Sequence, residues 1–204
     1  MSGVARDSML TGPAGPIEIE VDEPTGALRG VAVLCHPHPL HGGSMSNKVV
    51  QTLARAFVQM GYRSVRFNFR GVGRSQGQWD EGRGEVDDAL AVIASQRVAD
   101  LPLALGGFSF GAYVAACAAT RLAGQAPTER LVLVGPAAGR FAIPNVPSDT
   151  IVVHGEADEE VPLSATLDWA RPQSLPVLVF PGVGHFFHGQ LTLLKSQVMQ
   201  AWHR

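Results

Sequence analysis

A serine stands where a buried strand is expected to turn into a helix. Residues 103–114 read LALGGFSFGAYV, an apolar run that meets a Gly-x-Ser-x-Gly pattern and continues as small residues at helical spacing. Gly107 and Gly111 flank Ser109, and both positions must lack a Cβ if the strand is to reverse sharply with the helix packed against it. Such a turn holds a hydroxyl clear of the sheet, beside the free amides of the helix start. We therefore predict that Ser109 is a nucleophile, and not only the cap of an ordinary helix.

Two later loops carry groups that would activate this hydroxyl. A serine becomes a good nucleophile when a base takes its proton, and the base needs a third group that fixes its tautomer and stabilises its charged form. The loop over 155–162 contains four acids, and the loop over 182–188 contains two histidines. We predict Asp158 as the acid, because a short path joins it to the preceding strand, and His185 as the base. The chain order of serine, acid and histidine is one that such triads use.

The other polar residues of these two loops receive different predictions. Glu156 is the alternative choice for the acid. Glu159 and Glu160 precede Pro162 at an expected helix start, where negative charge favours the helix dipole. His188 lies near the expected start of the last helix, and we assign it no chemistry.

Acyl transfer also needs hydrogen-bond donors aimed at the developing oxyanion. The backbone N–H of Phe110 is one donor, since it follows the nucleophile at the helix start. The second is expected from the loop over 36–43, whose two prolines have no N–H to give. The backbone of His38 is favoured there, and that of Leu40 remains the alternative.

The same loop suggests a metal site as an alternative. His36, His38 and His41 follow the His-x-His-x-Asp-His spacing of metallo-β-lactamase-like enzymes, and imidazoles are the usual zinc ligands. Leu40 replaces the acid of that motif, the prolines restrict how the rings converge, and a metal site leaves the turn at Ser109 unexplained. We therefore favour a serine nucleophile over a metal site.

A glycine-rich loop over 70–77 resembles a phosphate cradle only loosely. The Walker spacing is absent, and no lysine and threonine pair follows. We predict a structural turn in which Arg70 pairs with Asp87 or Asp88.

These residues would be positioned by apolar strands that alternate with amphipathic helices. Strands are expected at 17–21, 30–35, 63–69, 131–134, 150–154 and 176–180, in addition to the strand before Ser109. Helices are expected from Ser44 or Ser46 to Gly61, through Val86, Leu90 and Ile93, after Ser109, from Pro162, and through Leu191, Leu194, Val198 and Trp202. A parallel crossover needs about a dozen residues, so the pattern predicts an α/β fold, a mostly parallel sheet flanked by helices on both faces. Chemistry then gathers beyond the carboxyl ends of the strands.

Length and composition indicate one core. A chain of 204 residues with 46% hydrophobic content is short for two domains, and we predict a single domain over 16–204 after a mobile tail over 1–15. The net charge of −2 comes from interspersed acids and bases, which argues against a nucleic-acid partner. The sequence contains no run of about eighteen apolar residues, so we predict no membrane-spanning segment.

The cysteines and the first strand bear on compartment and assembly. Cys35 and Cys117 fall in apolar segments and are expected to be buried small hydrophobes, which fits a reducing compartment and a cytoplasmic protein. The strand over 17–21 alternates apolar and polar residues, as an edge strand does. It offers a second copy a pairing edge, but its polar face favours solvent, so we expect a monomer or a weak homodimer.

Residues 30–188 resemble the α/β-hydrolase superfamily, in particular its small cap-less members of esterase and dienelactone-hydrolase type. The matching stretches are HPHPLHGGSMSNKVV (36–50), NFRGVGRS (68–75), GFSFG (107–111), HGEAD (154–158) and GH (184–185). The resemblance implies a triad of Ser109, Asp158 and His185, an oxyanion hole between the first loop and Phe110, and no cofactor. Many relatives carry a lid where this chain has only residues 135–149, too few for a helical cap, so the site should be open.

These observations together predict a serine hydrolase of carboxylesterase type. Leu40, Phe69 and Phe186 are candidate substrate-binding residues, and with Phe110 they favour short-chain or small aromatic acyl esters as the small-molecule substrate. The alternatives are the metal-dependent hydrolase and a non-enzymatic binding protein of the same fold.

Overall fold

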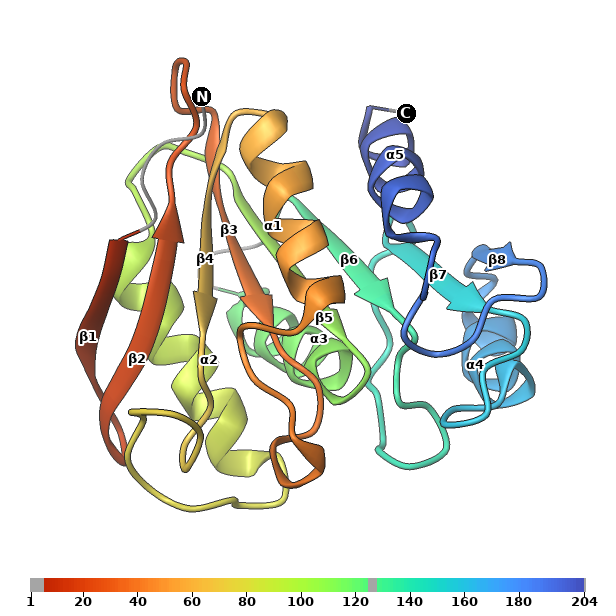
Figure 1. Ribbon diagram of the computed structural model, residues 1–204, viewed down its shortest axis with the longest axis horizontal. Helices are drawn as coiled ribbons and strands as arrows, with labels where there is room; N and C mark the ends of the chain where they lie inside the picture. Colours follow the sequence, from red (N-terminus) through yellow and green to blue (C-terminus); the bar gives the residue numbers. More distant parts are fainter. Residues whose placement is uncertain (1–5, 125–127, 204) are drawn as a thin grey trace.

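A sheet of mostly parallel strands organises the chain. The computed structural model describes residues 6–124 and 128–203. Within these residues, eight strands form one sheet in the order β1-β2-β4-β3-β5-β6-β7-β8 (Figure 1). The strands are β1 (Arg6–Gly12), β2 (Gly15–Asp22), β3 (Gly30–Cys35), β4 (Tyr62–Phe67), β5 (Leu103–Phe108), β6 (Arg130–Val134), β7 (Ile151–Gly155) and β8 (Val177–Phe180). β2 is antiparallel to both of its neighbours, and all later pairs are parallel, which confirms the predicted fold class.

Helices cover both faces of this sheet. They are α1 (Lys48–Gln59), α2 (Arg83–Gln96), α3 (Phe110–Leu122), α4 (Leu163–Ala170) and α5 (Leu191–Trp202), with 3₁₀ turns η1 (Pro39–His41) and η2 (Arg171–Gln173). α1 and α5 pack together on one face, and α2 and α3 pack together on the other (Figure 1). Because the strands from β3 to β8 run in one direction, the loops that follow them meet at one edge of the sheet. Among the helices so described, none is long and apolar enough to cross a membrane.

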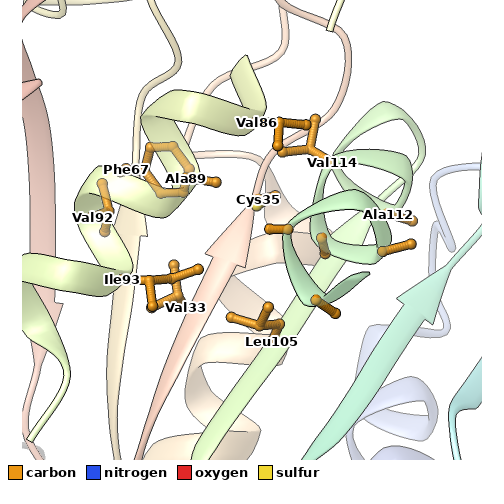
Figure 2. Packing of buried hydrophobic residues seen from close by; sticks show 14 of the residues in the cluster. Val33, Cys35, Phe67, Val86, Ala89, Val92, Ile93, Leu105, Ala112 and Val114 are labelled. Atoms are coloured by element: carbon orange, nitrogen blue, oxygen red, sulfur yellow. The ribbon is translucent and has the colours of Figure 1, made fainter. Parts of the chain in front are cut away.

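The core on the α2 and α3 face determines how closely α3 approaches the sheet. Figure 2 shows the strand side chains meeting those of the two helices: Val33, Cys35, Phe67 and Leu105 lie against Val86, Ala89, Val92, Ile93, Ala112 and Val114. Burying each of the larger side chains contributes about 1.5–3 kcal/mol. The alanines of α3 keep this helix close to β3 and β5, and its first residue follows directly on the turn at Ser109.

The amino-terminal segment differs from its prediction. Residues 6–12 form β1 and pair with β2 through a tight Gly12–Gly15 turn, so the mobile tail predicted over 1–15 is wrong for residues 6–15; residues 1–5 lie outside the described residues. The polar composition of this segment had suggested a mobile tail. Instead, it is ordered by backbone hydrogen bonds to β2 and by the packing of Leu10 against the core. The strand predicted over 17–21 is therefore flanked on both sides and is not an edge.

Two local predictions are refined by side-chain contacts. Asn47, and not Ser44 or Ser46, caps α1, because its Oδ1 accepts from the amides of Val49 and Val50. In the glycine-rich loop, Arg70 pairs with Asp88: its Nη2 lies 2.8 Å from Oδ1 and its Nε lies 3.0 Å from Oδ2. Asp87 instead pairs with Arg121.

Candidate active site

Ser109 lies at a strained turn between β5 and α3. Its φ is 57° and its ψ is −118°, a conformation that costs a non-glycine residue about 1–3 kcal/mol and is common at functional sites. A Cβ at Gly107 would collide with the backbone of Gly111, and a Cβ at Gly111 would collide with the carbonyl of Cys35. The two glycines are thus required by close backbone approach, as the sequence pattern predicted.

Backbone hydrogen bonds hold this turn and leave the hydroxyl unused by its own helix. The Ser109 amide donates to the Val134 carbonyl at 2.9 Å, and the Ser109 carbonyl accepts from the Ala112 amide at 3.0 Å. The Ser109 side chain makes no capping hydrogen bond to α3. It lines a cavity of about 340 Å³ that His185 also lines. The turn therefore presents the hydroxyl to the space that an imidazole faces.

Asp158 and His185 come together from the loops after β7 and β8. His185 Nδ1 lies 2.6 Å from Asp158 Oδ2, and both side chains are buried. The other carboxylate oxygen, Oδ1, accepts from the amides of Glu160 at 2.9 Å and Val161 at 2.8 Å. Burial alone would raise the pKa of Asp158, but the hydrogen bonds from His185 and Val161 outweigh it, and the pKa lies below its usual value. The ionised carboxylate accepts the Nδ1–H of His185, and this tautomer leaves Nε2 as a proton acceptor.

His154, which the sequence reasoning did not single out, lies behind the carboxylate. This histidine on β7 is fully buried, with Nε2 2.9 Å from the Val161 carbonyl and 3.4 Å from Asp158 Oδ2. The Thr166 hydroxyl lies 3.1 Å from its Nδ1. Burial lowers the pKa of His154, so the neutral ring donates from Nε2 and accepts at Nδ1. His154 thereby holds the loop that carries Asp158, and its only signal in the sequence is its place four residues before that acid.

The remaining acids and the second histidine of these loops have other contacts. Glu156 accepts from the Gly182 amide at 2.8 Å and lies on the exposed side of the loop. α4 begins at Leu163, with Pro162 as its N-cap, so Glu159 and Glu160 lie before its first turn and not within it. His188 is exposed and stacks on Phe186.

The two predicted oxyanion donors line the same cavity. Phe110 and His38 both line the space beside Ser109, and among the described residues neither backbone N–H has an acceptor within hydrogen-bonding distance. The Leu40 amide, in contrast, donates to Nδ1 of the His38 ring at 3.3 Å. Of the two alternatives for the second donor, the free amide of His38 is therefore favoured.

Two of the predicted substrate-binding residues lie away from the cavity. Phe69 is fully buried in the core beneath His36, with the ring centroids 4.4 Å apart. The burial of Phe69 contradicts its predicted role. Leu40 is 66% exposed on η1 and is not among the residues that line the cavity, so its contact with substrate stays a prediction. Phe186 does line it, and so does Phe141 from the loop after β6. Chain order could not predict which aromatic rings turn toward Ser109, because that depends on how the loops pack.

The three histidines of the first loop do not converge. His36 is fully buried; its Nδ1 donates to the Pro37 carbonyl at 2.7 Å and its Nε2 accepts from the Phe69 amide at 3.0 Å. Burial lowers the pKa of His36 to about 3. The rings of His38 and His41 stack with centroids 4.4 Å apart. In residues 6–124 and 128–203, no group of three His, Cys, Asp or Glu side chains is placed to hold a metal ion, so the three-histidine metal site is not formed.

Comparisons with known proteins identify the family and the fold of this chain. Residues 32–147 match the family described as serine aminopeptidase, S33. An α/β serine hydrolase without a lid from Xanthomonas campestris is 38% identical, with a TM-score of 0.90 over 98% of this chain and 94% of that one. An α/β serine hydrolase homologue from Coxiella burnetii is also 38% identical, with a TM-score of 0.83 over 96% of each chain. An uncharacterised protein of Rickettsia prowazekii is 44% identical over 110 residues, 52% of this chain but only 46% of the length of that curated relative.

Proposed function

Since the chain belongs to the α/β-hydrolase superfamily, and within it to the serine aminopeptidase family, we propose that this hydrolase cleaves carboxylic esters through a serine nucleophile. The observation that carries the proposal is the 2.6 Å hydrogen bond between His185 and Asp158, beside a cavity that the strained Ser109 also lines. A base with a fixed tautomer and a serine on a tight turn are two of the requirements of acyl transfer by a serine. We also propose that the substrate is a small-molecule ester and that the protein is located in the cytoplasm.

The first step forms an acyl-enzyme. Nε2 of His185 takes the proton of the Ser109 hydroxyl while Oγ attacks the ester carbonyl, whose π electrons move onto the oxygen. The amides of Phe110 and His38 bind that oxyanion. As the carbonyl re-forms, the bond to the alcohol breaks and His185 returns the proton to the leaving oxygen. Asp158 stabilises the imidazolium that exists between these two transfers.

The second step releases the acid. Water gives a proton to Nε2 of His185 as its oxygen attacks the acyl carbonyl, and the oxyanion is bound by the same amides. The tetrahedral intermediate collapses by breaking the bond to Ser109 Oγ, which regains its proton from His185. The cycle leaves the enzyme unchanged and needs no cofactor.

A fluorophosphonate probe and a panel of p-nitrophenyl esters of increasing acyl length test this proposal. The parent protein should be labelled at Ser109 and should hydrolyse the short esters, and Ser109→Ala should lose both properties. Ser164→Ala, which removes an exposed serine on α4, is the matched control and should keep both. A folded parent protein that is neither labelled nor active would support the binding-protein alternative. Loss of activity on chelation would support a metal-dependent reaction.

A further inference from the structure

The loop between β6 and β7 contributes a charged wall to the active-site cavity. This segment is too short for a lid, and it forms a tight turn in which the amides of Arg140 and Phe141 both donate to the Ala137 carbonyl, at 3.2 and 3.1 Å. Arg140 and Phe141 line the cavity together with Ser109 and His185. The loop therefore brings a permanent cation next to the proposed nucleophile.

Arg140 has no carboxylate partner within the described part of the chain. Its Nη2 donates to the backbone carbonyl of Glu160 at 2.6 Å, and no acid lies within ion-pair distance of its guanidinium. Other exposed arginines do find acids: Arg83 pairs with Asp80, Arg121 with Asp87 and Arg171 with Asp168. A guanidinium has five N–H donors, so the single bond to Glu160 leaves a fork that matches a carboxylate.

Arg140 and Glu160 both line the cavity, together with three histidines. Burial lowers the pKa of His38, and the nearby positive charges of His41 and Arg140 lower it further, so the field of Arg140 reaches the loop that would bind the oxyanion. The carboxylate of Asp158 accepts hydrogen bonds from His185 and from two backbone amides. Glu160 is the acid that faces Arg140 from the opposite loop, and it contributes its backbone carbonyl to the guanidinium.

We propose that the substrate of this site is an ester that carries a carboxylate, bound by the guanidinium fork of Arg140 while the ester carbonyl lies at Ser109. This inference rests on the proposed function and names its substrate class. The ring of Phe141 is only partly buried and lines the cavity next to Arg140, so it offers an apolar surface to the carbons between the ester and the acid. The exposed position of Arg140 suits a small, soluble, anionic ester. An aminopeptidase substrate, which carries an ammonium group, would meet a like charge here.

Three methyl esters of one chain length test the charge preference: monomethyl adipate, methyl hexanoate and methyl 6-aminohexanoate. A matched set places the charge on the alcohol: 6-acetoxyhexanoate, hexyl acetate and 6-aminohexyl acetate. With hydrolysis followed by pH-stat, we expect kcat/KM for the anionic member of at least one set to exceed that of its neutral partner about 10- to 100-fold, the range of a charge-assisted pair. The cationic member should be the poorest substrate, and added salt should narrow the differences.

Variants of Arg140 separate recognition from a structural role. Arg140→Gln should bring the anionic-to-neutral ratio close to one, and Arg140→Glu should reverse the order in favour of the cationic ester. Arg121→Gln, which removes an exposed arginine at the far end of α3, should keep the parent ratio. An equal fall for all three esters in Arg140→Gln would mean that Arg140 only braces the Asp158 loop, and would overturn the inference.

The outcomes for the parent protein distinguish this inference from the proposed function. Hydrolysis of the three esters at equal rates in both sets, or a preference for the cationic member, would overturn the carboxylate inference and leave ester hydrolysis intact. A parent protein that cleaves none of the esters and is not labelled at Ser109 would overturn both.

Discussion

Two histidine-bearing regions lie at the same edge of the sheet and use their imidazoles differently. In the loop after β3, both ring nitrogens of His36 are bonded to backbone groups, and its pKa is lowered to about 3. In the loop after β8, Nδ1 of His185 is bonded to Asp158 while its ring lines the cavity with Ser109. Both rings are buried. What separates a structural imidazole from a candidate base here is the group that its second nitrogen meets.

The largest effect is expected when the imidazole of His185 is removed. His185→Ala should lower kcat for a short p-nitrophenyl ester by about 10⁴-fold or more, because it removes the proposed base. The measurement is steady-state kinetics on protein whose far-ultraviolet circular dichroism matches the parent. His188→Ala, an exposed histidine three residues away, is the control and should keep the parent rate. Retention of the parent rate by His185→Ala would remove it from the mechanism.

The first loop should matter through its backbone and not through its imidazoles. His38 has a φ of −53°, which proline adopts without strain, so His38→Pro deletes the N–H and keeps the chain path. We expect kcat to fall about 100- to 1000-fold, the usual effect of losing one oxyanion donor. His38→Ala loses the ring but keeps the amide, and should lose far less activity. Equal losses in the two variants would place the effect in the ring.

His154 tests how much the position of Asp158 depends on the hydrogen bond that this buried ring donates to the Asp158 loop. His154→Leu leaves the Val161 carbonyl without its donor and withdraws a ring from beside Asp158, and we expect about a tenfold fall in kcat with a smaller change in KM. His154→Gln provides an amide donor in place of Nε2–H and should recover part of that loss. If the two variants fall equally while keeping the parent thermal stability, donation to the Val161 carbonyl is not what positions Asp158.

The smallest expected effect is on the pH dependence of the free energy of unfolding, and it arises from His36 in the loop after β3. The pKa of His36 is lower in the folded protein than in the unfolded chain, so the unfolded state binds more protons below about pH 6.5 and stability falls as the pH drops. This one group contributes a slope of up to about 1.4 kcal/mol per pH unit below its unfolded pKa. Urea titrations between pH 7 and 5 should therefore show a shallower slope for His36→Gln than for the parent. His188→Gln should keep the parent slope.

The parts of the site that were predictable from the sequence are those that local geometry requires. Gly107 and Gly111 flank Ser109 because the backbones there approach too closely for a Cβ, and this requirement is readable from the residue types. The approach of Asp158 to His185 was predictable because each follows a parallel strand by a short path, and such strands end at one edge of the sheet. The apolar runs of β3 and β5 likewise indicate strands that are covered on both faces.

The parts that were not predictable depend on contacts between segments distant in the sequence. Phe69 was expected to face the substrate, but the packing of His36 and Phe67 turns it into the core. Arg140 was not predictable, because the order of residues in its loop does not reveal which of its side chains lines the cavity. The order of residues 6–12 depends on pairing with β2, which polar composition does not reveal.

The sequence by itself determined the alternation of strands and helices, the bend at Ser109 and the order of the three groups proposed for catalysis, because each depends on backbone sterics and on short connections. Only the tertiary structure decided which ring lies behind Asp158, which aromatic rings line the cavity beside Ser109 and which cation borders it. Those outcomes depend on which side-chain atoms come within about 3 Å of one another, and hydrogen bonding at that range is set by the packing of whole elements.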